Sequence, residues 1–405
     1  MRILLLAPHP FYQERGTPIA VNLLLQALSG LGHQVDVLTY HEGSEVTYPG
    51  VTLHRIRRPP GVRNIPPGPS VKKILCDAVM VGHALRLARE NRYDLVHAVE
   101  ESVYMAQRIR RRVGTPYLYD MDSAMARQIA EKFPYFGFMR PLLEKFERAA
   151  ARDALAVVPV CEALADVARG YGAQKVFLLH DISLLQPATE PDRVAVRALI
   201  PPAPDAVTFM YVGNLESYQG IDLLLDGFAK ASAPPSSIHR DADGAAPSKN
   251  AEPSMRLIVV GGRADDVRRY QARAATLGLD RTVSFLGPQP VGLLAALFET
   301  ADVLVSPRVK GNNTPMKLYS YLASGRAVLA TDLPTHTQAL DPETACLAAP
   351  EPIAFAAALR RLAGDPGLRA TLGARAAVVA RERHSREAFA REAAALYAWV
   401  ERVPH

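Results

Sequence analysis

The loop and predicted helix start around Thr314 combine cationic side chains with a pattern suited to binding phosphate. Thr314 and Pro315 follow a polar loop that carries Arg308 and Lys310, and Lys317 comes directly after them. Thr caps free amides and Pro fits the first helical position, so we expect a helix to begin here. Its dipole disfavours a cation in the first turn, and a bound anion would offset that cost. The alternative for Lys317 is a solvent-exposed lysine at an ordinary helix start.

Carboxylates follow two predicted strand ends in the first half of the chain. Glu100 and Glu101 come after the strand that contains His97, and Asp120 and Asp122 come at the end of the next strand. Paired acids at strand ends either orient or deprotonate an acceptor hydroxyl, or they cap helices and structure loops. The sequence leaves both interpretations open. No histidine or third acid accompanies the Asp pair locally, so we expect no metal site.

Gly16 lies in the loop between the first predicted strand and the helix that begins near Pro18. A glycine there lets the backbone approach a phosphate closely, and it is equally common as an ordinary loop residue. No GxGxxG motif follows this strand, which disfavours a dinucleotide-dependent oxidoreductase.

Composition favours an ordinary two-domain globular protein. The chain has 405 residues, of which 49% are hydrophobic and 22% charged, and this length exceeds a comfortable single core. The three cysteines, Cys76, Cys161 and Cys346, are far apart and suit a reducing compartment. The N-terminal apolar run is too short for a signal peptide, and no stretch is long enough to span a membrane. We therefore expect a cytoplasmic protein.

Basic residues gather in the segments Arg55–Lys73 and Arg108–Arg112, and the formal net charge is +6. These runs are either solvated faces or sites that attract anionic lipid or a phosphorylated acceptor. We expect the first segment to bind peripherally to an anionic membrane surface, on the inner face of the membrane. Nucleic acid is disfavoured because no aromatic residues interleave with the basic runs.

Buried strands alternate with helical patterns in both halves, which predicts two parallel sheets covered on both faces. Two such doubly wound halves would face each other across a cleft lined by the carboxyl ends of their strands. The predicted strands are Ile3–Ala7, Val35–Leu38, Val51–Arg55, Leu95–Ala98, Tyr117–Tyr119, Ala156–Val160, Val207–Val212, Leu257–Val260, Val283–Phe285, Val303–Val305 and Ala327–Ala330.

We expect an N-terminal acceptor-side domain over 1–190, a linker over 191–206 and a donor-binding domain over 207–384. Within the last, residues 232–254 are rich in Ala, Pro, Ser and Asp without periodicity, which predicts a disordered insertion of unknown role. Residues 385–405 predict a helix that packs back on the N-terminal domain.

Several short motifs occur in an order that is similar to one enzyme family. They are Gly16, Asp94–Ala98, Tyr211–Leu225, Val259–Arg263, Phe285–Gly287 and Ser306–Val328. Together they resemble the family-4 retaining glycosyltransferases over nearly the whole chain, apart from 232–254. The resemblance implies the GT-B fold, which consists of two Rossmann-like domains.

The resemblance also assigns roles to individual residues. Together with the acids at the strand ends, it predicts His97, Glu100 and Asp120 as catalytic residues. It implies donor-binding residues Gly16, Gly213, Asn214, Gln219, Arg263, Arg308, Lys310, Asn312, Thr314, Lys317 and Ser320.

Charged residues that the family usually carries are replaced here. The two donor-site glutamates of the family read Asn312 and Ser320, and its phosphate-binding Arg and Lys read Asn214 and Gln219. Val99 stands where many members carry a second histidine. Neighbouring cations, Lys317 among them, would have to supply the missing positive charge.

The expected function is a metal-independent retaining hexosyltransferase of glycan biosynthesis. It would move a sugar from a nucleotide-sugar donor to a glycan or lipid-linked acceptor, and it would need no cofactor. The alternative is a catalytically silent GT-B module that partners an active transferase or binds glycan. A sugar-nucleotide epimerase and a phosphorylase are further options.

Overall fold

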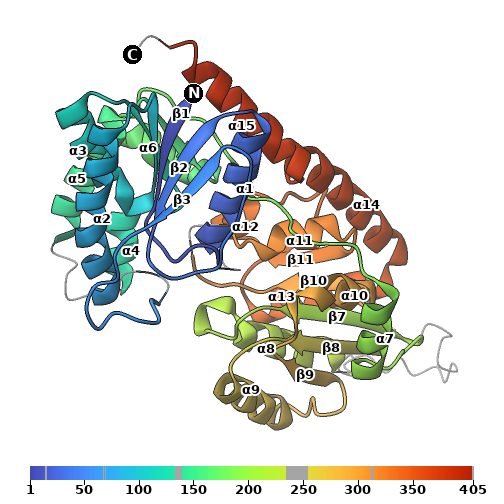
Figure 1. Cartoon of the computed structure of the whole chain (residues 1–405). Helices are drawn as coiled ribbons and strands as arrows, with labels where there is room; N and C mark the ends of the chain where they lie inside the picture. The colour runs from blue at the N-terminus through green and yellow to red at the C-terminus, as the bar shows by residue number, and fades with distance from the viewer. Residues whose placement is uncertain are drawn as a thin grey trace, which may run out of the picture. The chain divides into compact units, whose positions relative to one another are not determined.

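Buried strands and helices alternate along the chain (Figure 1). The computed structural model describes residues 1–13, 16–66, 68, 70–132, 139–233, 254–311 and 314–403. These residues form two compact units, Met1–Asp181 with Arg386–His405, and Ile182–Ser385.

The first unit contains a six-stranded parallel sheet in the order β3-β2-β1-β4-β5-β6. Helices α1 and α15 lie on one side of this sheet, and α2, α3 and α5 lie on the other (Figure 1). Such coverage explains why β4 and β5 are buried over their whole length. The strands are β1 (Arg2–Ala7), β2 (Gln34–Thr39), β3 (Val51–Arg55), β4 (Leu95–Val99), β5 (Tyr117–Met121) and β6 (Ala156–Pro159). The helices are α1 (Gly16–Gly30), α2 (Val71–Glu90), α3 (Val103–Val113), α4 (Met125–Lys132), α5 (Arg140–Asp153), α6 (Glu162–Tyr171) and α15 (Arg386–Val400), with a 3-10 turn, η1, at Glu100–Ser102.

The second unit contains another six-stranded parallel sheet, in the order β12-β11-β10-β7-β8-β9. Its strands are β7 (Ala206–Val212), β8 (Ser254–Val260), β9 (Val283–Gly287), β10 (Val303–Ser306), β11 (Ala327–Thr331) and β12 (Cys346–Ala348). Its helices are α7 (Glu190–Leu199), α8 (Ile221–Ser232), α9 (Ala264–Thr276), α10 (Leu294–Glu299), α11 (Lys317–Ala323), α12 (Pro334–Thr337), α13 (Pro352–Gly364) and α14 (Pro366–Arg383), with 3-10 turns η3 (Ser217–Gln219) and η4 (Val291–Leu293).

The two doubly wound parallel sheets confirm the predicted fold class. The strand pattern misses only β12, because three residues are too short to show a period. The segment 191–206, expected as a linker, contains most of α7, which begins with a capping box between Thr189 and Asp192. In the expected insertion, α8 ends at Ser232 and β8 begins at Ser254, and residues 234–253 lie outside the described residues.

The C-terminal helix α15 belongs to the first unit, where it packs against α1. Its Glu392 accepts a hydrogen bond from the backbone amide of His180 at 3.1 Å. Further along, the ring of Trp399 lies 4.9 Å from that of Phe177. The last helix of the chain therefore completes the core of the first unit.

Candidate functional site

Each sheet has a point at which the chain leaves a central pair of neighbouring strands in opposite directions. In the first unit this pair is β1 and β4, and in the second unit it is β7 and β10. Loops that follow such a pair diverge and leave room for a ligand at the carboxyl ends of the strands. In the second unit these are the loops 213–220 and 307–316, which contain most of the predicted donor ligands.

Lys317 opens α11 and reaches back to the loop after β7. Its Nζ donates a hydrogen bond to Oε1 of Gln219 at 3.1 Å and lies 4.1 Å from the ring centroid of Tyr211. Gly213, whose φ is 151°, has no side chain beside this ammonium. A Cβ built on it would lie 3.4 Å from Nζ, so a larger residue would crowd Lys317. Among the described residues Lys317 takes part in no ion pair.

Arg308 places a second positive charge close to Lys317. Its guanidinium lies 5.2 Å from the ring centroid of Tyr218, and its Nε donates to the backbone oxygen of Lys310 at 2.7 Å. Burial, together with the charge of Arg308, lowers the pKa of Lys317 to about 7. Burial also lowers the pKa of Arg308. Two neighbouring cations with lowered pKa values are destabilised by burial and by each other. A bound polyanion would remove this destabilisation.

Thr314 adds a hydroxyl to the same loop. Its side chain is 9% exposed, and its Oγ1 has no hydrogen-bond partner within the described ranges. Buried hydroxyl groups almost always have a partner, so this one is available to a ligand.

The helix start differs from the prediction. α11 begins at Lys317 rather than at Thr314, and its N-cap residue, Met316, makes no side-chain cap. The amide of Leu318 bonds the backbone oxygen of Pro315 at 2.9 Å, which tightens the turn in place of a Thr cap. Since α11 has only seven residues, the charge of Lys317 rather than the dipole dominates this site.

A buried histidine that the sequence analysis did not single out fixes the loop after β10. His336 makes hydrogen bonds of 2.9 Å to the hydroxyls of Ser306 and Thr331. Thr331 Oγ1 in turn donates to the backbone oxygen of Arg308 at 2.6 Å. Burial lowers the pKa of His336 to about 4, so the ring is neutral near pH 7. No sequence motif marks this network, because its members come from separate strand ends.

The remaining predicted donor ligands differ from Lys317 and Arg308 in their surroundings. Asn214 closes its own loop, because its Oδ1 accepts from the amide of Glu216 at 3.3 Å. Ser320 is half-buried within α11. Arg263, at the N-cap of α9, and Lys310 are both exposed, and Asn312 lies outside the described residues.

A cavity of about 650 Å³ opens in the first unit between α1, α2, α4 and the loop after β4. Its lining includes Lys73, which is ion-paired with Glu101, and Asp77, which accepts a hydrogen bond from the Tyr40 hydroxyl at 2.6 Å. Burial and the nearby Glu101 raise the pKa of Asp77 to about 7. The sequence analysis missed Lys73 and Asp77 as cavity residues, because α2 follows β3 rather than the switch-point strands.

Glu100 lines the same cavity with a backbone that few residues adopt. Its φ is 48°, in the left-handed region, and non-glycine residues held there often belong to functional sites. Burial and the neighbouring Glu101 raise the pKa of Glu100 to about 7, although the Ser123 hydroxyl donates to it at 3.3 Å. The loop therefore holds a carboxyl group that is readily protonated near neutral pH.

Further carboxyl groups at this sheet edge repel one another. Burial and Asp120 raise the pKa of Asp181 to about 6, and the same causes raise that of Asp122 well above its usual range. Hydroxyl groups that donate hydrogen bonds would relieve this repulsion.

His97 lies inside the protein rather than in the cavity lining. The side chain is fully buried, its Nε2 lies 3.1 Å from Asp120 Oδ2, and its Nδ1 lies 2.7 Å from the Tyr397 hydroxyl. Both ring nitrogens are thus engaged, and His97 holds Asp120 in place rather than facing a ligand. Tyr397 comes from α15, and no sequence signal connected it with this strand.

Gly16 begins α1 with φ of 36°, and a Cβ built on it would meet nothing within 4 Å. Space for a ligand therefore exists beside it, and the neighbouring Thr17 lines the cavity. Residues 14 and 15 of the same loop are outside the described ranges.

The described part of the chain has no cluster of metal-ligating side chains, no membrane-spanning helix and no disulfide. No three His, Cys, Asp or Glu side chains gather there in a way that would hold a metal ion. None of the described helices has the length and apolarity needed to cross a membrane. The three cysteines are buried and form no disulfide.

Two family models match the chain. The model described as "Glycosyl transferase 4-like domain" matches residues 15–180, and the model described as "Glycosyl transferases group 1" matches residues 206–365. The first match covers strands β2 to β6, and the second covers strands β7 to β12.

Curated relatives match parts of the chain. A D-inositol 3-phosphate glycosyltransferase of Corynebacterium diphtheriae is 27% identical over 200 residues, which are 48% of this chain and 43% of that protein. The protein of that name from Geodermatophilus obscurus is 32% identical over 123 residues, which are 29% and 24%. The matched region thus spans less than half the length of either relative.

Solved structures match over the whole chain. A sucrose-phosphate synthase of Thermosynechococcus elongatus has a TM-score of 0.75 at 20% identity, with 99% of both chains covered. HepE of Anabaena, in complex with UDP-glucose, has a TM-score of 0.68 at 18% identity and covers 98% of this chain and 100% of its own. At these identities the likeness shows the fold, which is GT-B. With both family models matched and this fold, the chain belongs to the group 1 glycosyltransferases, and its N-terminal half is of the glycosyl transferase 4-like type.

Proposed function

We propose that this chain transfers a sugar from a nucleotide-sugar donor to a glycan or lipid-linked acceptor with retention of configuration. The donor binds the second unit at the loops after β7 and β10. The acceptor binds the cavity of the first unit. The reaction needs no metal ion or cofactor, and the protein acts in the cytoplasm, on the inner face of a membrane.

The observation that carries this proposal is the ammonium of Lys317, held in a half-buried site beside Arg308. Its contacts are the Gln219 amide oxygen and the Tyr211 ring, and neither carries a negative charge. A diphosphate would supply charge to both cations and accept a hydrogen bond from the Thr314 hydroxyl. The HepE structures hold UDP and UDP-glucose, which supports a nucleotide-sugar donor.

Residues of the two units perform different tasks in the proposed reaction. Lys317 and Arg308 neutralise the diphosphate as it leaves, which lowers the barrier because the negative charge develops next to fixed cations. The retaining mechanism needs no protein nucleophile, since the leaving phosphate assists the incoming hydroxyl. Glu100 and Asp120 orient that hydroxyl in the first unit. The inositol phosphate relatives act, by name, on a polyol phosphate, which agrees with a hydroxyl-rich acceptor.

Calorimetry with UDP, GDP, ADP and their glucose conjugates tests the proposal. We expect one nucleoside diphosphate to bind, and the conjugate with the same base to be consumed when a suitable acceptor is present. The absence of binding by all six compounds at millimolar concentration would contradict the proposed function.

Turnover distinguishes a catalytically silent module from an active transferase. A silent module binds nucleotide without consuming the conjugate, and Ser320→Glu combined with Gln219→Lys would then restore activity. Turnover by the unmodified chain excludes it.

A further inference from the structure

Exposed apolar side chains concentrate on three neighbouring helices of the first unit. Of the thirteen large apolar side chains that the described residues expose, eight lie on α2, α3 and α5. α2 contacts α3, and α3 contacts α5 (Figure 1). Four of the eight form a stripe along α2 with helical spacing, namely Val71, Ile74, Leu75 and Val79. Exposed apolar side chains that gather on neighbouring helices in this way are typical of an interaction site.

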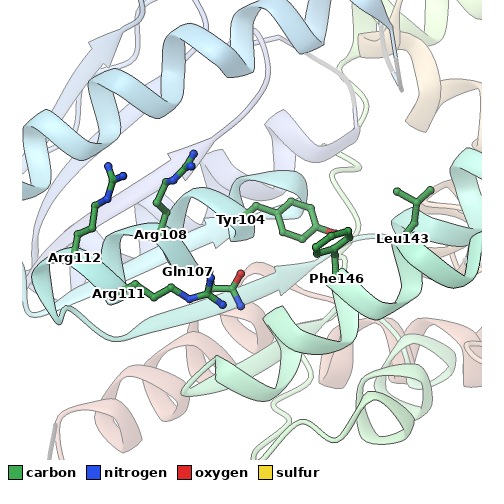
Figure 2. A pocket seen from close by; sticks show the side chains of 7 residues that line it. All are labelled: Tyr104, Gln107, Arg108, Arg111, Arg112, Leu143 and Phe146. Carbon is green, nitrogen blue, oxygen red and sulfur yellow. The ribbon is translucent and has the colours of Figure 1, made fainter. Parts of the chain in front are cut away.

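A groove of about 590 Å³ lies between α3 and α5 on this face, and its two ends differ in chemistry (Figure 2). Arg108, Arg111 and Arg112 gather at one end, whereas Tyr104, Leu143 and Phe146 lie at the other. Phe146 is 55% exposed, and Leu142 beside it is 49% exposed. A ligand that fits both ends carries a negative charge next to an apolar body.

The guanidinium groups of this groove are largely uncompensated. Arg111 lies 3.7 Å from Asp153, but within the described ranges neither Arg108 nor Arg112 forms an ion pair. Cations in a last helical turn do stabilise the helix dipole, and this accounts in part for Arg111 and Arg112. It does not account for Arg108 one turn earlier, nor for the exposed Leu142 and Phe146 on another helix.

The basic segment Arg55–Lys73 fits a membrane surface less well than its sequence predicts. Arg55 donates to the backbone oxygens of Phe11 and Glu42 at 2.7 and 3.0 Å. Lys72 donates to the backbone oxygen of Arg63 at 2.6 Å, and Lys73 is ion-paired with Glu101. Three of its six cations therefore hold the protein's own loops together.

We propose that the face formed by α2, α3 and α5 docks on an anionic lipid bilayer, with a lipid phosphate seated between Arg108 and Arg112. Phe146 and Leu142 enter the boundary between headgroups and acyl chains, as the α2 stripe does. Charge complementarity favours this occupant, because basic groups that flank exposed apolar side chains match an anionic headgroup above its acyl chain. The docking proposal does not rest on the proposed transfer reaction, but the two adjoin, because Val71 and Ile74 of the α2 stripe also line the cavity of the first unit.

Sedimentation of the full chain with phosphatidylglycerol–phosphatidylcholine vesicles, and with phosphatidylcholine vesicles alone, tests this proposal. We expect binding only to the anionic vesicles and a decline as salt rises. Arg108→Gln with Arg112→Gln, and separately Leu142→Ser with Phe146→Ser, should each weaken binding roughly tenfold or more.

Matched controls exist on the second unit and on the other basic segment. Val291→Ser with Ile353→Ser removes two apolar side chains that are more exposed than Leu142 and Phe146, and Arg57→Gln with Arg58→Gln removes two exposed cations. Both control pairs should bind as the unmodified chain does, and circular dichroism checks that every variant is folded. Equal binding to neutral vesicles, no binding at all, or losses confined to the control pairs would each overturn the proposal.

Discussion

The ammonium of Lys317 donates a hydrogen bond to the side-chain amide of Gln219, 98 positions away in sequence, over 3.1 Å. Gln219 lies in the loop after β7, and Lys317 begins the helix that follows the loop after β10. The contact therefore joins the two sides of the switch point in the second unit. An amide oxygen satisfies a donor without neutralising its charge. The site therefore keeps a positive charge ready for an anion.

Replacing Lys317 with Met should weaken nucleoside diphosphate binding by about 30-fold or more, since removal of a half-buried cation from its anion costs roughly 2–5 kcal/mol. Calorimetry with the tightest-binding nucleoside diphosphate measures the loss. Lys230→Met is the matched control, because Lys230 is exposed in the last turn of α8. If both variants lost affinity equally, general charge rather than this site would attract the ligand.

Diphosphate binding should take up a proton above neutral pH. Burial and the charge of Arg308 lower the pKa of Lys317 to about 7 in the empty site, and a bound polyanion raises it again. Affinity should therefore fall by up to about tenfold per pH unit above pH 7, as the empty site loses its charge. Calorimetry at pH 8 in buffers of different ionisation enthalpy detects the proton.

The Lys317→Met variant should show neither the proton uptake nor the decline in affinity. A pH-independent affinity in the unmodified chain between pH 7 and 9 would mean that the ammonium stays charged in the empty site.

The fold was predictable because continuous apolar strands and helix periodicity are local signals. The place of Lys317 near a helix start was predictable for the same reason, since a cation that follows a buried strand and a loop is visible in sequence. Its contact with Gln219 was not, because only the strand order brings the two loops together. Nor was the hydrogen bond from Tyr397 to His97, which depends on how a helix some 300 positions later packs. Long-range packing of this kind leaves no periodic trace in the chain.

Glu100→Gln should stabilise the protein at pH 8 and leave its stability unchanged near pH 4. The folded state raises the pKa of this carboxyl from 4.5 to about 7. The folded state therefore holds the proton more tightly than the unfolded state. The free energy of unfolding declines as pH rises from 4.5 to about 7. Removing the ionisable group should recover roughly 1–3 kcal/mol above pH 7.

Thermal unfolding of Glu100→Gln from pH 4 to 8.5 measures this difference, with Glu90→Gln as the control on an exposed carboxylate. We also expect the more stable variant to lose transferase activity, because the strained, charged loop serves acceptor binding. An equal gain in the control, or a loss of stability at pH 8, would contradict the assignment.

Gly220→Ala should lower the free energy of unfolding far more than Gly278→Ala does. Both glycines nevertheless have nearly the same backbone, with φ of 72° and 70°. A Cβ on Gly278 meets nothing within 4 Å, whereas one on Gly220 would collide with the backbone oxygen of Pro307. The left-handed backbone alone costs about 1–2 kcal/mol, and the collision should add roughly 1–3 kcal/mol. Because Gly220 directly follows Gln219 and Pro307 directly precedes Arg308, relief of the collision moves both sides of the donor site. Gly220→Ala should therefore lose nucleoside diphosphate affinity in its folded fraction, while Gly278→Ala keeps it. Thermal unfolding and calorimetry on the two variants measure both effects, and equal losses would show that the backbone at Pro307 yields without disturbing the site.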